Sequence, residues 1–125
     1  MDLKVFILLL VVFLASCLCE ESKYTTKYDN IDIDRILSNR RILTNYIKCI
    51  LDQGPCTPDG REFRRNIPDA LQTGCQKCSE AQKKIVQKTS DYIRNNRPDD
   101  WNKIRMKFDP EGKYSKTFEQ FLNEK

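Results

Sequence analysis

The sequence predicts an all-α fold in a single domain. Apolar residues recur at intervals of three and four, as they do along one face of a helix, and no segment alternates apolar and polar residues like a half-buried strand. Four cysteines spaced C-x6-C-x18-C-x2-C follow an apolar N-terminal leader. A short exported chain with these cysteines is typical of a domain stabilised by disulfides.

Residues 1–19 are predicted to be a secretory signal peptide. Lys4 precedes an unbroken apolar run from Val5 to Ala15, and small residues then suit cleavage after Cys19. The run is too short to span a bilayer. Cleavage would release residues 20–125 as one extracellular domain, whose net charge of +4 equals that of the full chain because the leader contains one acid and one base.

The leader also permits a second interpretation. Leu14-Ala15-Ser16-Cys17 looks like the signal of a bacterial lipoprotein, in which Cys17 would carry the lipid. We favour the secretory signal, because a short pattern of common residue types recurs by chance.

The first two predicted helices lie before a turn that contains glycine and proline. Asp32 can cap a short helix that reaches about Ser38. A second helix over 40–51 carries a wide apolar stripe and ends at Gln53-Gly54-Pro55. The stripe consists of Ile42, Leu43, Tyr46, Ile47, Ile50 and Leu51.

The third predicted helix opens at Pro58-Asp59-Gly60. Pro68 would lie inside it, and an internal proline removes a backbone donor and clashes with the preceding turn. We therefore expect this helix to kink or restart at Pro68, where Asp69 can cap a new turn.

Three more helices are predicted towards the C-terminus. Ser79 and Gln82 form the pattern of a capping box at the start of a fourth helix, which ends before Pro98. Asp99 is expected to cap a fifth helix, from about Trp101 to Phe108. After the turn at Asp109-Pro110-Glu111-Gly112, a sixth helix is marked by Tyr114, Phe118, Phe121 and Leu122.

The composition argues against catalysis. A chain without histidine cannot form a Ser-His-Asp or Cys-His arrangement or an HExxH zinc site, and its four glycines form no phosphate-binding loop. Asp99 and Asp100 are adjacent carboxylates, but their place at a helix start suits caps better than an acid and a base. We expect no enzymatic activity and no cofactor.

The basic residues are mixed with acidic ones. Arg61, Arg64 and Arg65, for example, surround Glu62. Proteins that bind single-stranded nucleic acid interleave basic residues with stacking aromatics, and this chain shows no such block. We therefore expect solvated helix faces and no nucleic-acid partner.

The four cysteines after the leader allow three disulfide connectivities. The turn after Cys49 can bring it back to Cys56, and Cys75 and Cys78 are one helical turn apart. Nested pairs would close longer loops, and loop entropy would then contribute about 3.6 and 3.3 kcal/mol, against about 2.5 and 1.9 kcal/mol for local pairs. The residues alone leave the pairing open.

Two other roles for the cysteines are less favoured. Zinc binding needs reduced thiolates, which an exported chain does not favour, so we expect no metal. A redox role for Cys75-Gln76-Lys77-Cys78 needs a thioredoxin-like strand before the helix, and none is visible.

Several motifs accompany the cysteine spacing. They are Tyr24-Thr25-Thr26-Lys27-Tyr28-Asp29-Asn30-Ile31-Asp32, Gly54-Pro55-Cys56-Thr57-Pro58-Asp59-Gly60, Pro68-Asp69-Ala70-Leu71, Asn96-Arg97-Pro98 with Trp101, and Asp109-Pro110-Glu111-Gly112-Lys113-Tyr114. Together they resemble the insect chemosensory proteins, also called the OS-D or pheromone-binding-like family, over essentially all of residues 20–125. Gly74 departs from the family pattern, which more often has a charged or polar residue there, and could loosen that turn.

The resemblance implies a fold and a function. It implies six helices around an apolar channel, with disulfides Cys49 to Cys56 and Cys75 to Cys78. It also implies a secreted soluble carrier of small hydrophobic or amphiphilic molecules, such as odorants, pheromone components, long-chain fatty acids or alcohols.

The candidate ligand contacts are mostly aromatic residues with one polar group, which suit an alkyl chain with one polar head. They are Tyr28, Tyr46, Trp101, Tyr114, Ile47 and Ile85. Ile47 suits an ordinary core better than a ligand contact. For Tyr46 and Trp101 the family resemblance supplies most of the weight.

A second function remains compatible with the sequence. A secreted, helical signalling or interaction protein could act on a protein receptor or on a membrane surface, and its charge of +4 would permit either. For the carrier we expect a hydrophobic small-molecule ligand, a possible membrane receptor and a monomeric chain. A carrier should retain lipid after purification, whereas an interaction protein need not.

Overall fold

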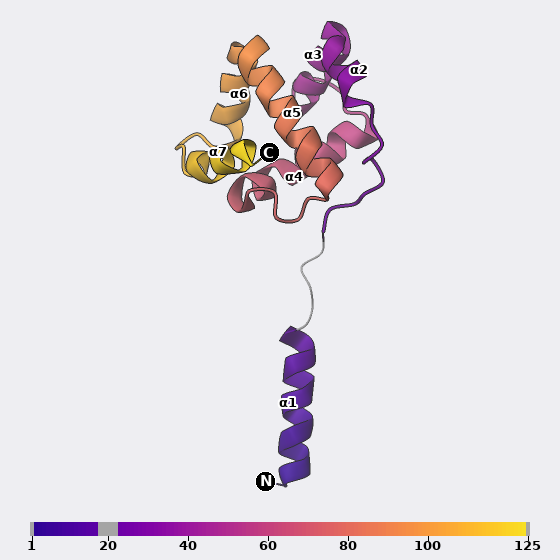
Figure 1. The fold of residues 1–125 in the computed structure, drawn as a ribbon, viewed down its shortest axis with the longest axis vertical. Helices are drawn as coiled ribbons and strands as arrows, with labels where there is room; N and C mark the ends of the chain where they lie inside the picture. Colours follow the sequence, from indigo (N-terminus) through magenta and orange to yellow (C-terminus); the bar gives the residue numbers. More distant parts are fainter. Residues whose placement is uncertain (1, 18–22, 125) are drawn as a thin grey trace.

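The computed structural model describes residues 2–17 and 23–124. Within these ranges the regular structure is helical throughout: α1 (Leu3–Cys17), α2 (Ile33–Ser38), α3 (Arg40–Ile50), α4 (Pro58–Thr73), α5 (Glu80–Asn96), α6 (Pro98–Phe108) and α7 (Ser115–Asn123). Figure 1 shows α2 to α7 gathered into one bundle, with α1 standing apart from it. The predicted all-α fold is confirmed, and α2 to α7 are the six short helices expected after the leader.

The helix α1 covers most of the predicted signal peptide. Its side chains from Leu3 to Val11 are exposed. The predicted cleavage after Cys19 lies outside the described residues, and the signal peptide stays a prediction. Across the described parts of the chain, no helix combines the length and the apolar character needed to cross a bilayer.

Side chains cap the starts of four helices in the bundle. Two of the predicted caps are confirmed: Asp32 accepts a backbone N–H in the first turn of α2, and Ser79 and Gln82 form both hydrogen bonds of a capping box at α5. Asn39 and Thr57 cap α3 and α4 in the same way. Each cap satisfies a backbone donor that would otherwise lack a helical partner.

The helix α4 continues without interruption from Pro58 to Thr73, so of the two outcomes expected at Pro68 the restart is wrong, and the kink stays a prediction. Pro68 is exposed, and its missing N–H deprives the helix of one hydrogen bond only, to the carbonyl of Arg64. Packing of α4 against α3 and α7 outweighs this loss. Asp69 caps no new turn and instead accepts a hydrogen bond from the Tyr24 hydroxyl.

The helix α6 starts earlier than predicted, at Pro98 instead of Trp101. Asp99 therefore lies in the first turn, and Arg97 occupies the cap position without a side-chain cap. Proline suits a first turn because the N–H that it lacks would have no helical partner there. Asp100, also in this turn, forms an ion pair with Arg97 at 2.8 Å.

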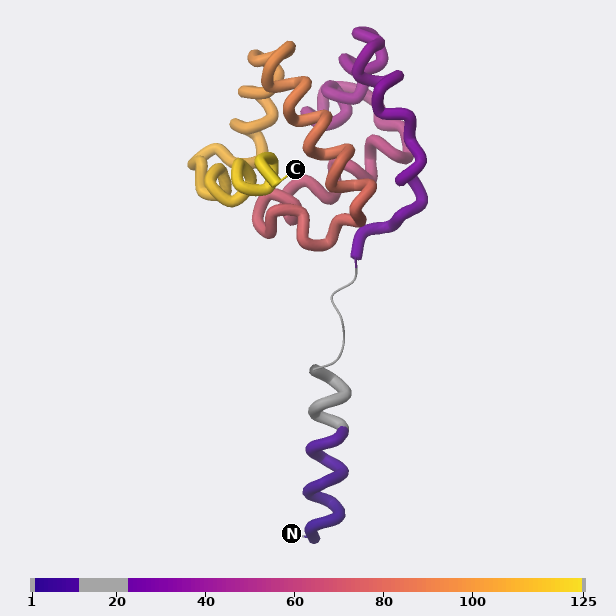
Figure 2. Tube along the Cα trace, in the orientation of Figure 1, coloured from indigo at the N-terminus to yellow at the C-terminus, as the bar shows by residue number. Residues whose placement is uncertain are grey.

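The helix α5 runs through the centre of the bundle, between α2 and α3 on one side and α6 and α7 on the other (Figure 2). It packs against α2, α6 and α7, while α3 packs against α2 and α4. Two clusters of buried side chains form the core. The Cys75 cluster contains Ala70, Cys75, Cys78, Phe121 and Leu122, and the Leu43 cluster contains Leu37, Leu43, Ile47 and Ile93.

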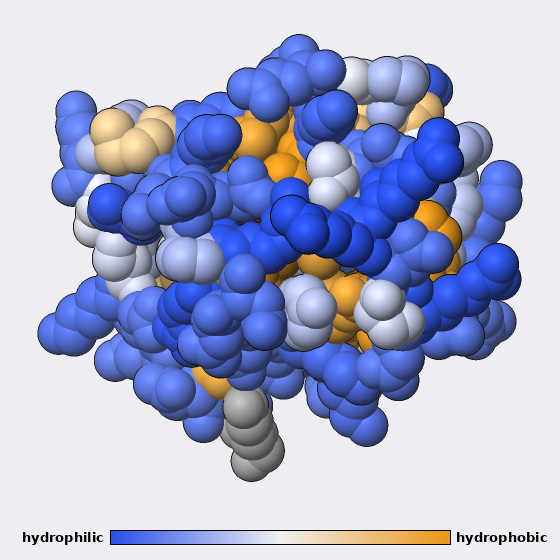
Figure 3. Space-filling view, turned by 90° about the horizontal axis from the view of Figure 1, so that it is seen from above, coloured by the Kyte–Doolittle hydropathy of each residue, from blue (hydrophilic) through white to orange (hydrophobic). Residues whose placement is uncertain are grey.

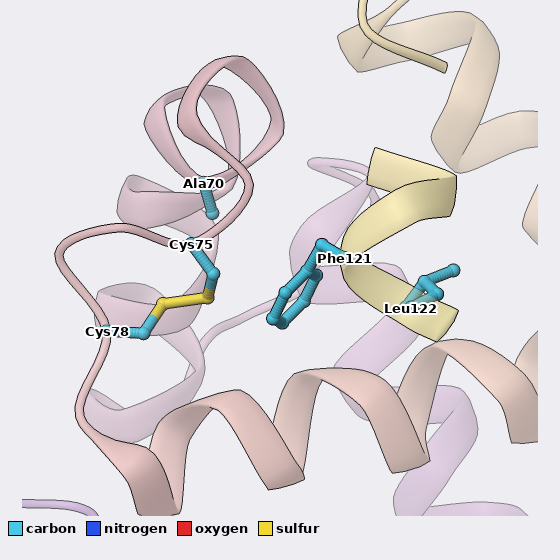
Figure 4. Close-up of a cluster of buried hydrophobic side chains, with 5 residues drawn as sticks. All are labelled: Ala70, Cys75, Cys78, Phe121 and Leu122. Carbon is cyan, nitrogen blue, oxygen red and sulfur yellow. A yellow bond between two sulfur atoms is a disulfide. The ribbon is translucent and has the colours of Figure 1, made fainter. Parts of the chain in front are cut away.

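Both disulfides are local. Cys49 pairs with Cys56 and Cys75 pairs with Cys78, with Cα–Cα distances of 5.0 and 5.2 Å. These bonds confirm the pairing implied by the family resemblance and exclude the nested one. Figure 4 shows the second disulfide opposite the ring of Phe121, which α7 contributes to the same cluster.

The turn that precedes the second disulfide favours glycine. Gly74 ends α4 with a φ of 64°, and Cys75 follows with a φ of 67°. Glycine adopts this left-handed conformation without the steric cost that a side chain adds. The departure from the family pattern at Gly74 therefore suits the conformation of the turn, which its N–H closes by donating to the carbonyl of Ala70.

Two tyrosine hydroxyls hold neighbouring elements to α4. Tyr24, in the segment before α2, donates to Asp69 Oδ2 at 2.5 Å, and Tyr46 of α3 donates to Asp59. Burial, followed by the hydrogen bond to Asp69, raises the pKa of Tyr24 well above its usual range. Burial and the hydrogen bond to Asp59 likewise raise the pKa of Tyr46.

Removing the second disulfide should destabilise the bundle without unfolding it. Closing so short a loop contributes about 1.9 kcal/mol, so Cys75→Ala combined with Cys78→Ala should lower the free energy of unfolding by about 2 kcal/mol or more. Chemical denaturation followed by far-ultraviolet circular dichroism measures this change. Since no distant helices are joined by either bond, full reduction should leave most of the helical signal at room temperature. Complete loss of that signal would show that the disulfides are essential to the fold.

Alkaline titration should reveal late-ionising tyrosines among the five in the chain. Folding raises the pKa of Tyr24 and Tyr46 above the unfolded value of about 10. Their contribution to stability is therefore complete below a pH of about 10 and is lost as the pH rises through the raised values. Tyrosinate absorbance should stop short of its full amplitude while the helices persist. Tyr24→Phe should reduce the absorbance increase that appears only at the highest pH. Full amplitude with intact helices would contradict this expectation.

Candidate functional site

A cavity of about 240 Å³ lies where the two core clusters would otherwise meet. It is lined by Ala70 and Cys78 of the Cys75 cluster and by Leu43, Ile47 and Ile93 of the Leu43 cluster. Protein interiors are normally packed without voids larger than a water molecule. The helices of this bundle therefore enclose a space that their side chains do not fill.

Every helix of the bundle contributes to the lining, together with the segment before α2. The apolar contributors include Ile33 and Ile36 of α2, Tyr46 and Ile50 of α3, Phe63, Ile67 and Leu71 of α4, Ile85 and Val86 of α5, Trp101, Ile104 and Phe108 of α6, and Phe118 of α7. The wall is thus an almost continuous apolar surface, suited to hydrocarbon.

Five of the six predicted ligand contacts line this cavity. They are Tyr28, Tyr46, Ile47, Ile85 and Trp101. The structure brings together residues from the segment before α2 and from α3, α5 and α6, which are far apart in the sequence. Their contact with a ligand stays a prediction.

Tyr114 is the exception, since it is not among the lining residues. Its backbone N–H donates to Asp109 Oδ2 at 3.1 Å, and the Lys113 ammonium lies 5.6 Å from its ring centroid. These contacts hold Tyr114 in the turn that starts α7. The neighbouring Phe118 lines the cavity instead.

Sequence reasoning missed the contribution of α4. Phe63, Ile67 and Leu71 lie at intervals of four residues and so share one helix face. This spacing is a signal that could have identified them. The expected break at Pro68 obscured it, because a restarted helix would have turned the last of these side chains to another direction.

Trp101 connects α6 to α7 beside the cavity. Its ring stacks on that of Phe118, with the centroids 6.5 Å apart and the planes 22° apart. It also packs against the Leu43 cluster. The chain's single tryptophan therefore lies against both the core and the empty space.

Few polar atoms interrupt the apolar wall. Asp29 Oδ1 and Thr89 Oγ1, from lining residues, are buried and have no hydrogen-bond partner among the described residues. The Tyr46 hydroxyl already donates to Asp59. Burial would raise the pKa of Asp59, but hydrogen bonds with Thr57, Tyr46 and the local backbone outweigh it and lower that pKa.

Polar contacts join α3 and the turn after it to α6, and α3 and α6 line the cavity without packing extensively against each other. Near the start of α6, Arg97 Nη1 donates to Thr44 Oγ1 at 2.8 Å. Near its end, Lys107 pairs with Asp52, which also pairs with Arg64. The hydrogen bond from Lys107, together with the two positive charges, lowers the pKa of Asp52.

Apolar residues of the bundle also reach the molecular surface. Figure 3 shows apolar surface visible between long hydrophilic side chains on the face seen from above. Within residues 2–17 and 23–124, no group of three or more histidine, cysteine, aspartate or glutamate side chains could hold a metal ion. The chemistry that the described site offers is apolar enclosure with a few fixed polar atoms.

Comparison with known proteins identifies relatives of this chain. The sequence profile of the insect pheromone-binding family, A10/OS-D, matches residues 24–116. Ejaculatory bulb-specific protein 3 of Drosophila melanogaster is 48% identical over 112 residues, which cover 90% of this chain and 89% of that protein.

Solved structures show the same fold. A chemosensory protein in complex with bromo-dodecanol superposes with a TM-score of 0.72 at 39% identity, over 78% of this chain and 98% of the other. Antennal chemosensory protein A6 from the moth Mamestra brassicae gives a TM-score of 0.64 at 34% identity, over 74% and 90% of the two chains. The family resemblance is thereby confirmed: this chain belongs to the insect pheromone-binding family, A10/OS-D.

Proposed function

We propose that this protein is a secreted, soluble carrier that holds small hydrophobic or amphiphilic molecules in its internal cavity. The observation that carries the proposal is the unfilled apolar space between the two core clusters. Apolar surface removed from water contributes about 25 cal/mol per Å², and a hydrocarbon chain in this space would lie largely against apolar side chains.

The size of the cavity favours slender ligands. Pockets for drug-sized molecules usually measure roughly 300–1,000 Å³. A cavity of about 240 Å³ is slightly smaller and suits an alkyl chain better than a bulky ring system. The related chemosensory protein in complex with bromo-dodecanol supports the same ligand class for this chain, which includes odorants, pheromone components and long-chain alcohols or acids.

The other elements of the proposal rest on the sequence and the family. The apolar leader supports export to the extracellular space, and the family's description as pheromone-binding supports a binding protein instead of an enzyme. A membrane receptor and a monomeric state remain predictions. The signalling or interaction protein is the less favoured function, because it gives no role to the cavity.

Trp101 should report ligand binding. Because its ring borders the cavity, adding dodecanol should change its fluorescence saturably as the alkyl chain replaces empty space. Trp101→Ala should weaken binding more than it reduces the far-ultraviolet helical signal. If emission is unchanged at a dodecanol concentration that displaces a fluorescent probe, Trp101 is a core residue only.

Affinity should rise with chain length until the cavity is full. Ten methylenes leaving water gain roughly 8 kcal/mol, while association costs at least about 4 kcal/mol, so a chain of this length should bind with a dissociation constant of about 1 mM at best, and longer chains should bind more tightly. One methylene should alter it only about fourfold. Displacement of a fluorescent apolar probe by alcohols of about twelve to eighteen carbons tests this range. A flat response, or no probe uptake by folded and delipidated protein, would contradict the carrier function.

A further inference from the structure

Hydrogen bonds at the start of α5 fix the position of Asp29, which lines the cavity. The Ser79 hydroxyl donates to Asp29 Oδ2 at 2.8 Å and accepts the backbone N–H of Gln82 at 3.1 Å. Gln82 Nε2 in turn donates to the carbonyl of Thr25 at 2.6 Å. The capping box of α5 thus extends to the segment that carries Asp29 and holds its carboxylate in one place.

The second oxygen of this carboxylate has no partner. Asp29 Oδ1 is buried and accepts no hydrogen bond from the described residues, although Asp29 borders the cavity. Leaving a buried acceptor of a charged group unsatisfied is costly, and native structures rarely do so. Oδ1 has almost no accessible surface in this structure, so a ligand donor in the cavity would satisfy it after a small shift of the carboxylate or its neighbours.

The charges around the cavity also favour a ligand that donates a hydrogen bond and carries no negative charge. The acidic lining residues are Asp29, Asp59, Glu62, Asp109 and Glu119, and the basic one is Arg105, which is exposed. Glu62 and Glu119 form ion pairs with arginines outside the lining. No ion pair within the described residues neutralises the three aspartates, so the cavity presents negative charge to a ligand.

We propose that Asp29 Oδ1 accepts a hydrogen bond from the ligand's head group, so that the cavity prefers long-chain alcohols and ammonium amphiphiles to fatty-acid carboxylates. This inference rests on the proposed carrier function. A carboxylate has no proton to donate to Asp29 and would be repelled by the unneutralised aspartates. The hydroxyl of an alcohol donates one hydrogen bond and brings no charge.

Thr89 is the other lining residue with an unpartnered buried atom. It lies ten positions after Ser79 on α5, which corresponds to about 15 Å along the helix. A hydroxyl can donate or accept, so a head group at Thr89 would not distinguish an alcohol from a carboxylate by hydrogen bonding. Thr89→Val therefore separates the two positions experimentally.

Four ligands of equal chain length test the proposal at one neutral pH: dodecanol, dodecylammonium, dodecanoate and the methyl ether of dodecanol. Each is used to displace a fluorescent apolar probe from the delipidated protein. Dodecanol and dodecylammonium should bind about tenfold more tightly than dodecanoate, as expected for one hydrogen bond to a charged acceptor. The ether, which only accepts, should bind more weakly than the alcohol.

Asp29→Asn should reduce the ratio between alcohol and carboxylate affinity to about onefold to threefold. Asparagine keeps an oxygen for the Ser79 hydroxyl and places an amide donor where the free oxygen was, so the fold is preserved. Glu111→Gln is the matched control, because it removes one negative charge from an exposed residue outside the lining and should leave the ratio unchanged. Circular dichroism verifies that each variant is folded.

The outcomes separate this inference from the carrier function. If dodecanoate binds wild type as tightly as dodecanol, or if Asp29→Asn leaves the ratio unchanged, the role of Asp29 is wrong while the carrier function stands. A change in the ratio with Thr89→Val but not with Asp29→Asn also overturns it. If the folded protein takes up neither probe nor any of the four ligands, the carrier function fails and this inference fails with it.

Discussion

The bundle depends on the packing of α5 against both halves of the core. Its apolar face places Val86 against the Cys75 cluster and Ile93 within the Leu43 cluster. Gln87, between them in sequence, donates to the carbonyls of Phe121 and Glu124 at 2.9 and 2.8 Å and so satisfies the end of α7. One helix therefore contributes to both clusters, which the stack of Trp101 on Phe118 also connects, and the space left beside it becomes the cavity.

An unfilled space of about 240 Å³ is expensive for a small domain. A closed cavity costs roughly 24 cal/mol per Å³ relative to a filled core, and most proteins are stable by only about 5–15 kcal/mol, so space left unfilled between the helices lowers the stability of the bundle. The disulfides, whose cysteines Cys49, Cys75 and Cys78 are buried, and the tyrosine hydrogen bonds stabilise the chain around this space without filling it. A ligand that fills the interior restores the missing contacts, so binding and stability are linked through the same space.

Signals that act within one helical turn were predictable, which is why the caps at Asp32 and Ser79 and the boundaries of α2 agree with the sequence. The errors at Pro68 and Asp99 arise where packing between distant helices, or the tolerance of a first turn for proline, decides the outcome. The positions of Tyr46 and Trp101 beside the cavity were suggested mainly by the family resemblance. Whether Phe63 and Tyr114 line the cavity depends on the direction in which α4 and the turn before α7 face. Contacts with residues far away in the sequence determine that direction.

The contacts of Asp52 and Arg97 give the cavity walls of two different kinds. Between α3 and α6, the Lys107–Asp52 ion pair and the half-buried Arg97–Thr44 hydrogen bond add to the apolar packing of Trp101 and Ile104, and added salt screens the ion pair over about 10 Å at 0.1 M. Between α4, α5 and α7 the wall is held mainly by buried apolar side chains, which kosmotropic salts strengthen and cooling or urea weakens. Ionic strength therefore acts on the charged contacts of the wall, whereas cooling and urea act on its apolar packing, so the medium around the protein determines which kind of contact loosens first.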